Sequence, residues 1–445
     1  MANRYWVGGT ATWDAGSGAA NRWSTTSGGA GGAATPTAAD DVFFDAASAA
    51  AVVTLVDAVS LCRSMVCTGF TGTIVHPAAA NFQIGDGTAG AFTLVSGMTY
   101  TLGDVATSLI TFKSTTTGNN LTFAGKTLGN ITFNGVGGAW TFQDALTIGA
   151  TATLTLTNGS LNINGKTCSL GLLVSSNANT RVLTLGAAAI TLTGVGTIWS
   201  MATVTGLTLS AASSTITVSD VGSSSKTFAG GGKTFGNVTV TAEGTGAFII
   251  TGANTFATLT LAGAKTVTFP QSATTTITTL VANGTSGHVL TINSGSAGTQ
   301  ATISTAVNIS SDYLAITDIT LTGGATWRIG KNSTATADTV GLSFAPKVEA
   351  STRIVFDEED SVALGTKFHV TSMAWLSDTS PKDIASGDVM ELKDSLDGVA
   401  GESVVRKVAT ATGDGIPLSV CDFIVQNPMC ETLDGGVLYL YGERL

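Results

Sequence analysis

The stretch "GKTLGNITF" (residues 125–133) recurs as "GKTFGNVTV" at residues 232–240, and GKT alone occurs a third time at 165–167. GKT could end a phosphate-binding P-loop, or it could be the turn of a repeated structural unit. A P-loop requires a glycine five residues before the GK glycine, but those positions hold Asn120, Ser160 and Thr227. Each copy is followed by alternating apolar and polar residues, which predict a strand and not a helix. The stretch therefore predicts a repeated turn and strand.

The same pattern extends over residues 49–346. Segments such as "LTFAGKTLGNITFNG" (121–135), "ATLTLTNGSLNINGKTCSLG" (152–171) and "FATLTLAGAKTVTFP" (256–270) are short alternating strands separated by Gly or Asn-Gly. The units are about twenty residues long, as expected when each unit buries its apolar face only by stacking on the next. Hairpins could give similar alternation, but regular two-residue hairpin turns are missing and Asn recurs at the corners. We therefore expect an all-β protein whose middle domain is a right-handed parallel β-helix.

Two different segments flank this middle domain. Residues 1–48 are rich in aromatic residues and are expected to form an N-terminal cap. Residues 353–445 contain 7 Lys/Arg and 16 Asp/Glu, leaving 13 and 14 for the preceding part of the chain. This charged segment has about six strand patterns, typical of a small β-sandwich or barrel, and we expect it to dock or oligomerise.

Four aromatic residues of the cap are candidates for a functional role. Tyr5, Trp6, Trp13 and Trp23 could pack over the first turn of the β-helix, or they could anchor a partner or stack on sugars. Both roles are compatible if the cap is also the docking surface.

Composition excludes several classes of function. Only 11% of the residues are charged and the net charge is −10, which disfavours a nucleic-acid partner held through its phosphates. No apolar run approaches the length of a membrane span, and the N-terminus has no export-signal pattern. The five cysteines are not spaced as zinc pairs, so we expect free buried thiols, with no metal site and no cofactor.

Catalytic residues are sparse along the chain. Between residues 105 and 311 there are only three acidic residues, and the three histidines are 212 and 81 residues apart. No local Ser-His-Asp or HExxH arrangement can be built from them. A glycosidase would need two or more acids facing one groove, which only stacking of distant turns could supply. The residues concerned are Asp144, Asp220 and Glu243, with His76, His288 and His369. We predict a protein that is not an enzyme.

Other acidic residues invite narrower hypotheses. Turn and capping roles are expected for Asp40, Asp41 and Asp45 near the cap. Asp312 and Asp318 occupy even spacing on one strand pattern, so they should share a face that could hold a sugar or ion, although a solvated edge is the alternative. These two residues and Trp327 are the candidates for contact with a glycan.

The ends of the repetitive region carry a resemblance to a known group. "NRYWVGGTATWD" (3–14), "NRWS" (21–24) and "PTAADDVFFD" (36–45) resemble the opening of bacteriophage and prophage-encoded structural proteins with a Trp-Gly-Gly cap and a parallel β-helix. "SSDYLAITDITLTGGATWRIGKNST" (310–334) is similar to the closing turns of that group, except that Arg328-Ile329 replaces an expected aromatic residue. The resemblance spans roughly residues 1–345. Residues 353–445, with "RIVFDEED", "FHVTSMAW" and "DGGVLYLY", resemble a small β domain encoded near virion genes.

The resemblance implies a component of a tailed bacteriophage particle: a head fibre or decoration protein, or a tail fibre or spike. The implied partners are other virion proteins, further copies of the chain (such fibres are often trimers) and a host surface glycan. The implied location is the virion, assembled in the host cytoplasm. Two alternatives remain open: a tailspike depolymerase that acts on host polysaccharide, and a secreted bacterial adhesin, which would need an export signal and a membrane barrel.

Overall fold

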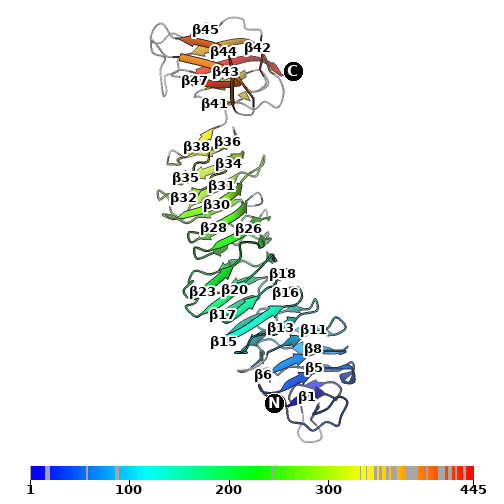
Figure 1. The fold of residues 1–445 in the computed structure, drawn as a ribbon. Coiled ribbons are helices and arrows are strands. Elements are labelled where there is room, and N and C mark those ends of the chain that lie inside the picture. The colour runs from blue at the N-terminus through cyan, green and yellow to red at the C-terminus, as the bar shows by residue number, and fades with distance from the viewer. Residues whose placement is uncertain are drawn as a thin grey trace. The chain divides into compact units, whose positions relative to one another are not determined.

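The computed structural model describes residues 2–15, 21–56, 59–85, 90–241, 244–261, 263, 265–330, 332–336 and 338–344, and the backbone of the strands between 348 and 444. The chain is all-β, with a parallel β-solenoid of about 13 turns and, in the described residues, a short 3₁₀ helix, η2 (Ala46–Ser48), but no α-helix. It divides into two compact units, one of residues 1–307, 315–325 and 335–340 and the other of residues 308–314, 326–334 and 341–445. Within the first unit each turn stacks on the one before it (Figure 1). The prediction of a parallel coil is confirmed.

Two sheets form most of the solenoid wall. The long sheet has 21 strands. They are β1 (Asn3–Trp6), β3 (Trp23–Ser24), β4 (Asp41–Phe43), β6 (Val59–Cys62), β7 (Ser64–Val66), β9 (Asn81–Ile84), β10 (Phe92–Thr93), β12 (Leu109–Phe112), β13 (Asn119–Thr122), β15 (Asn130–Phe142), β17 (Thr153–Asn162), β19 (Leu172–Val174), β20 (Arg181–Thr184), β22 (Gly196–Ser200), β23 (Leu207–Ser210), β25 (Lys226–Ala229), β27 (Phe248–Thr251), β29 (Thr266–Phe269), β31 (Leu290–Ser294), β34 (Leu314–Thr317) and β37 (Thr334–Ala335).

The second wall is a ten-stranded sheet. It contains β14 (Thr127–Leu128), β16 (Leu146–Ile148), β18 (Cys168–Leu170), β21 (Ala189–Leu192), β24 (Thr215–Val218), β26 (Thr234–Val240), β28 (Thr255–Thr260), β30 (Thr274–Val281), β32 (Ala301–Ser304) and β35 (Ile319–Thr322). A smaller parallel sheet of the first unit contains β2 (Ala11–Thr12), β5 (Val52–Thr54), β8 (Thr73–His76) and β11 (Thr99–Leu102). In the second unit, β33 (Ile309–Ser311), β36 (Trp327–Ile329) and β38 (Leu342–Phe344) form a parallel sheet.

Alternation of side chains separates the inside of the coil from the outside. In the ten-stranded sheet, seven apolar residues stack in register on the inner face, each nearly or fully buried: Leu146, Cys168, Ile190, Ile216, Val238, Leu259 and Leu280. The residue after each of these points outward, and those outward residues are Thr147, Ser169, Thr191, Thr217, Thr239, Thr260 and Val281. No strand of this sheet contains a charged residue. Burial of each large apolar side chain contributes about 1.5–3 kcal/mol, so the inner stack stabilises every turn without charges.

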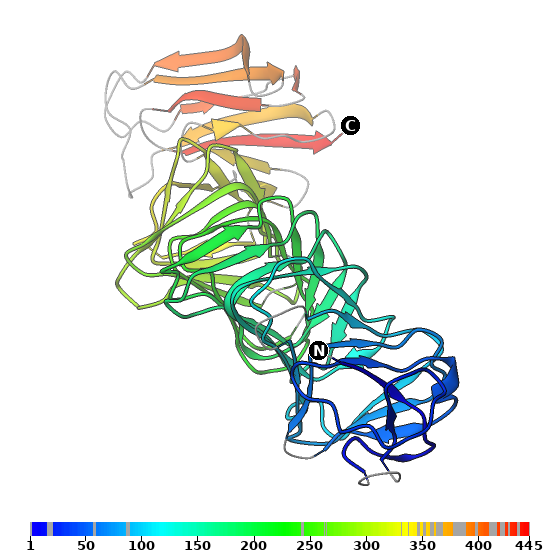
Figure 2. The same ribbon diagram turned by 60° about the horizontal axis from the view of Figure 1, so that its bottom comes forward.

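Aromatic rings continue the same inner stack behind the long sheet. Phe112 and Phe133 pair in register on β12 and β15, and their rings lie parallel with centroids 5.1 Å apart. Trp199 lies in the same way against Phe228, at 5.4 Å. Figure 2 shows the chain of the first unit winding around this common interior. The core is therefore a continuous column that runs along the coil.

The repeated GKT marks one corner of the coil. Gly125, Gly165 and Gly232 have φ angles of 71°, 68° and 72°, a left-handed conformation that favours glycine. Directly after two of these turns, Thr127 and Thr234 begin β14 and β26 of the ten-stranded sheet. The phrase therefore recurs because the same corner recurs, as the sequence predicted.

The strands of the second unit beyond residue 347 are antiparallel. One sheet contains β39 (Val348–Glu349), β40 (Arg353–Phe356), β42 (Phe368–Leu376), β45 (Ile416–Leu418), β46 (Phe423–Val425) and β48 (Val437–Arg444). The other contains β41 (Asp360–Ser361), β43 (Val389–Leu396), β44 (Val399–Val408) and β47 (Pro428–Leu433).

Candidate functional site

The tryptophans of the N-terminal segment form a buried cluster. Trp6 and Trp23 face each other on the antiparallel pair β1–β3, with ring centroids 5.0 Å apart, and Trp13 lies 4.9 Å from Trp23. All three are at most 2% exposed. The indole N–H groups of Trp6 and Trp23 donate to the carbonyls of Gly9 (3.0 Å) and Trp13 (2.8 Å). Contact of these three rings with a partner or a sugar, one of the two roles expected from the sequence, is not available because they are buried.

Tyr5 differs from the tryptophans because it points outward from the same strand. Its ring is half-buried and stacks on Phe43 of β4, with centroids 4.8 Å apart and an angle of 17° between the planes. Of the four aromatic candidates, Tyr5 is the one whose ring can still meet a second molecule.

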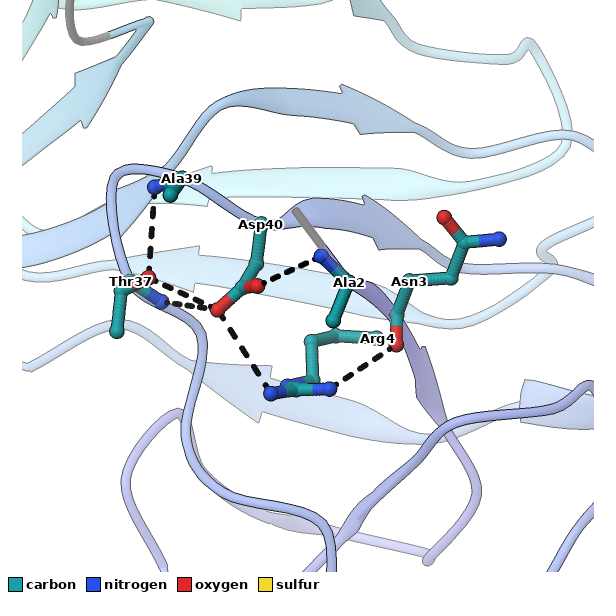
Figure 3. A network of polar contacts seen from close by, with 6 residues as sticks. All are labelled: Ala2, Asn3, Arg4, Thr37, Ala39 and Asp40. Carbon is teal, nitrogen blue, oxygen red and sulfur yellow. Dashed lines mark hydrogen bonds and ion pairs between the residues drawn. The ribbon is translucent and has the colours of Figure 1, made fainter.

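A polar network fixes the loop that precedes β4 (Figure 3). The carboxylate of Asp40 accepts hydrogen bonds from the backbone N–H groups of Ala2 (3.1 Å) and Thr37 (3.0 Å) and from the Thr37 hydroxyl (2.9 Å). The Arg4 guanidinium lies 3.9 Å away. Burial alone would raise the pKa of Asp40, but the hydrogen bonds from Thr37, the charge of Arg4 and the Ala2 N–H hold it below its usual value. The carboxylate is engaged in holding β1 against the loop.

The neighbouring aspartates have comparable roles. Asp41 accepts hydrogen bonds from the guanidinium of Arg63 and the hydroxyl of Ser64. Asp45 caps the N-terminus of η2 by accepting from the backbone N–H of Ala47 at 2.9 Å. The turn and capping roles expected for Asp40 and Asp45 are confirmed, whereas Asp41 begins strand β4 and its carboxylate binds side chains of the next turn.

Asp144 and Asp220 lie at corners of the coil. Asp144 accepts from two backbone N–H groups of the preceding turn, those of Phe123 (2.7 Å) and Ala124 (2.6 Å). Asp220 lies 2.7 Å from the ammonium of Lys226, and a hydrogen bond from this ammonium is the first cause of its lowered pKa. Glu243 lies outside the described residues. Each of the two described carboxylates is engaged within the fold.

The candidates for glycan contact are also occupied. Asp318 is buried and has a positive φ of 56°, and its carboxylate accepts from the N–H of Gly298 at 2.9 Å. Asp312, which lies in the second unit, accepts from the N–H of Tyr313 (2.8 Å) and from the backbone and side chain of Asn332 (3.0 and 2.7 Å). Burial opposes ionisation of Asp312, but these bonds lower its pKa below the ordinary value. The two residues do not share a strand face, because β34 spans only Leu314–Thr317 and both lie outside it.

Trp327 is the clearest correction. Its side chain is fully buried, and its indole N–H donates to the hydroxyl of Ser311 at 3.2 Å. It occupies an inward position of β36, so its ring packs in the core and cannot stack on a sugar at the surface.

The described histidines do not form a catalytic arrangement. His76 is buried; its Nδ1 lies 2.9 Å from the Tyr100 hydroxyl and its Nε2 lies 3.0 Å from the carbonyl of Ala80. Burial lowers the pKa of His76, although the bond to Ala80 opposes that shift. His288 is exposed in a loop where its backbone pairs with Thr285. The His369 side chain lies outside the described part of the chain.

Two buried cations were missed from the sequence. Arg181 is 1% exposed and Lys226 is 4% exposed, and both begin strands of the long sheet. Alternation along the strands could have revealed both. Arg181 lies two residues before the inward Leu183, and Lys226 lies two residues before the inward Phe228, so each side chain points to the inner face. Charged residues are normally assigned to the outer face, and that assumption hid them.

Cys62, Cys67 and Cys168 are free and buried as expected, and burial raises the pKa of Cys168 to about 12, which makes its thiol unreactive. The side chains of the other two, Cys421 and Cys430, lie outside the described residues. Across the described ranges, no three His, Cys, Asp or Glu side chains gather as a metal-ion site would require. No helix in this described part of the chain has the length and apolarity of a membrane span.

Comparison with known proteins adds no relative: the chain matches no family model, no curated protein and no solved structure.

Proposed function

We propose that the chain is a non-enzymatic structural component of a tailed bacteriophage particle, in which the solenoid, taken as right-handed, forms a stiff fibre or decoration appendage. The observation that carries this proposal is that the aspartate carboxylates bind backbone and side-chain groups of the fold itself. Eight aspartates of the described residues accept hydrogen bonds or ion pairs from the fold itself: Asp40, Asp41, Asp45, Asp104, Asp144, Asp220, Asp312 and Asp318. Carboxylates fixed in this way hold turns together and are poorly placed to act as acid and base on a substrate.

The ends of the coil suit such an appendage. An open parallel sheet invites further strands at its terminal edges, so a stable rod needs both ends covered. At the N-terminal end, β3 pairs with β1 in the antiparallel direction. The first strand of the coil is therefore covered by a strand that does not continue the parallel stack. In this proposal the buried tryptophan cluster and β3 are the cap, and the antiparallel strands beyond residue 347 form the small sandwich or barrel that docks or oligomerises.

The outer surface supports the same role. Outward-facing residues of the ten-stranded sheet are mostly Thr and Ser, and its strands contain no charge. A neutral hydroxyl surface resists nonspecific adhesion in the host cytoplasm and still offers donors and acceptors to a neutral host glycan. Because Asp318 and Trp327 are buried, any such contact would use these outward hydroxyls or Tyr5.

Immuno-electron microscopy of purified particles tests the proposal. An antibody raised against residues 353–445 should label the particles, over the whole shell for a decoration protein or at one vertex for a tail component. Absence of label from intact and gently disrupted particles would contradict the proposal. Release of reducing sugar from host polysaccharide by the purified chain would instead favour the depolymerase.

A further inference from the structure

Arg181 is a cation placed inside a coil that otherwise buries apolar residues. It is the first residue of β20 and is 1% exposed. Its backbone pairs with Gly159 of the preceding turn and Leu207 of the following turn. Arg181 therefore begins a strand that lies between those two turns, next to a corner of the coil.

The guanidinium uses all of its five N–H groups at this corner. Nε donates to the Ser175 hydroxyl (2.7 Å), and the terminal nitrogens donate to the carbonyls of Ser175 (2.7 Å) and Asn179 (2.8 Å) in its own turn. The same nitrogens donate to the carbonyls of Thr203 (2.8 Å) and Thr205 (2.9 Å) in the next turn. One side chain thus satisfies backbone groups of two corner loops, residues 175–180 and 201–206.

The charge of Arg181 is not balanced by a carboxylate among these partners. All five acceptors are neutral oxygens, and the sequence between Asp144 and Asp220 contains no acidic residue. Burial accordingly lowers the pKa of the guanidinium. If one loop opened alone, the other would keep a buried cation with too few acceptors, which is strongly unfavourable.

Lys226 provides a natural contrast. It is also a buried cation at the start of a strand of the long sheet, but its ammonium contacts the Asp220 carboxylate (2.7 Å) and the Gly222 carbonyl (2.8 Å), both in its own loop. Its bonds can therefore form or break within one turn.

We propose that Arg181 is a coupling residue, which makes the corner loops 175–180 and 201–206 open together and so joins two neighbouring turns into one cooperative unit. In a solenoid, stability is approximately a sum of terms for each turn and for each interface between turns, so one strong interface can set where cooperativity extends. This inference concerns the coil alone and stands apart from the proposed role in a virion.

Hydrogen–deuterium exchange on the full chain tests the proposal. Arg181→Met should speed exchange in both 172–184 and 196–210 by about tenfold or more, since one hydrogen bond to a charged group is worth at least that factor. Ser175→Ala removes the acceptor of Nε and the hydrogen bond that the Ser175 hydroxyl donates to the Leu156 carbonyl of the preceding turn (3.2 Å). Neither bond involves 196–210, yet the variant should also speed exchange in 196–210, by a smaller factor. In the double variant, Ser175→Ala should add nothing at 196–210.

The matched control is Lys226→Met, which should speed exchange in 215–229 and in β22, whose residues pair with β25, and leave 203–210 at the rate of the unaltered chain. Unchanged exchange at 196–210 in Arg181→Met would overturn the proposal. So would a double variant in which Ser175→Ala speeds exchange at 196–210 by the same factor as it does alone. If Arg181→Met does not fold, Ser175→Ala decides alone: faster exchange at 196–210 supports coupling, and an effect confined to 172–184 overturns it.

Discussion

His76 illustrates how single polar residues are used inside this coil. Both of its ring nitrogens have a neighbour, Tyr100 on one side and the Ala80 carbonyl on the other, and the ring is kept from water. Aspartates at the corners are used in the same way, as acceptors for backbone N–H groups. Backbone groups at the corners lack the hydrogen bonds of a regular strand ladder, and these polar side chains supply partners for them.

The first prediction concerns pH. Burial lowers the pKa of His76 in the folded chain, so as the pH falls the unfolded chain takes up the proton first, and the free energy of unfolding should decrease below about pH 6.5. Urea unfolding midpoints at pH 7.5 and pH 5.5 should therefore differ more in the unaltered chain than in His76→Phe. His288→Ala, at an exposed histidine, should keep the pH dependence of the unaltered chain. Equal pH dependence in His76→Phe and the unaltered chain would contradict the assignment.

The second prediction concerns Asp144. Asp144→Ala leaves the N–H groups of Phe123 and Ala124 without their acceptor, and should cost about 1–3 kcal/mol. The measurement is amide exchange over residues 121–126, where protection should fall. Asp14→Ala, at an exposed aspartate, should change stability by less than about 0.5 kcal/mol. Equal protection in the two variants would show that the carboxylate does not hold this corner.

Strands and turns are the scale at which the sequence was most informative. Alternation after "GKT" predicted strands, and the glycine of each copy adopts the left-handed conformation of a turn. Register was less accessible, because paired residues of successive turns in the ten-stranded sheet are 18 to 28 positions apart (Ala301 to Ile319, Thr274 to Thr302), and loops of unequal length absorb the difference. Alternation predicts which residues face inward, but loop length decides which turn they meet.

A matched pair of glycines gives the third prediction. Gly118 and Gly159 share a φ of 82°, so alanine at either position incurs the same left-handed penalty of about 1–2 kcal/mol. At Gly159 a Cβ would also lie 2.6 Å from the carbonyl oxygens of Gly135 and Gly138, whereas at Gly118 nothing lies within 4 Å. Gly159→Ala should therefore destabilise by about 1–3 kcal/mol more than Gly118→Ala, as overpacking does. Thermal melting of the two variants measures the difference, and equal melting temperatures would contradict the packing of β15 on β17.

For the molecule as a whole, composition and repetition predicted the architecture better than they predicted the sites. Few charges, many Thr and Gly and a twenty-residue period indicated a stacked coil, because only stacking can bury such units. The candidate sites were less predictable: Trp327 and Asp318 looked accessible on a linear pattern, but burial depends on the turns packed around each residue. Arg181 was overlooked for the converse reason, since two of its partners lie 22 and 24 residues away in the next turn.

The most direct test of the stacked coil is a set of distances between spin labels on the outward column of the ten-stranded sheet. Cysteines would replace Thr127 with Thr217 in one variant and Thr127 with Thr260 in another, with Cys421 and Cys430 changed to Ser. The register places these pairs four and six strands apart. At a strand spacing of about 4.8 Å, the backbone separations should be about 19 Å and about 29 Å. An increase of about 10 Å between the two pairs is the predicted result. A second pair no farther apart than the first would contradict the solenoid and everything inferred from it.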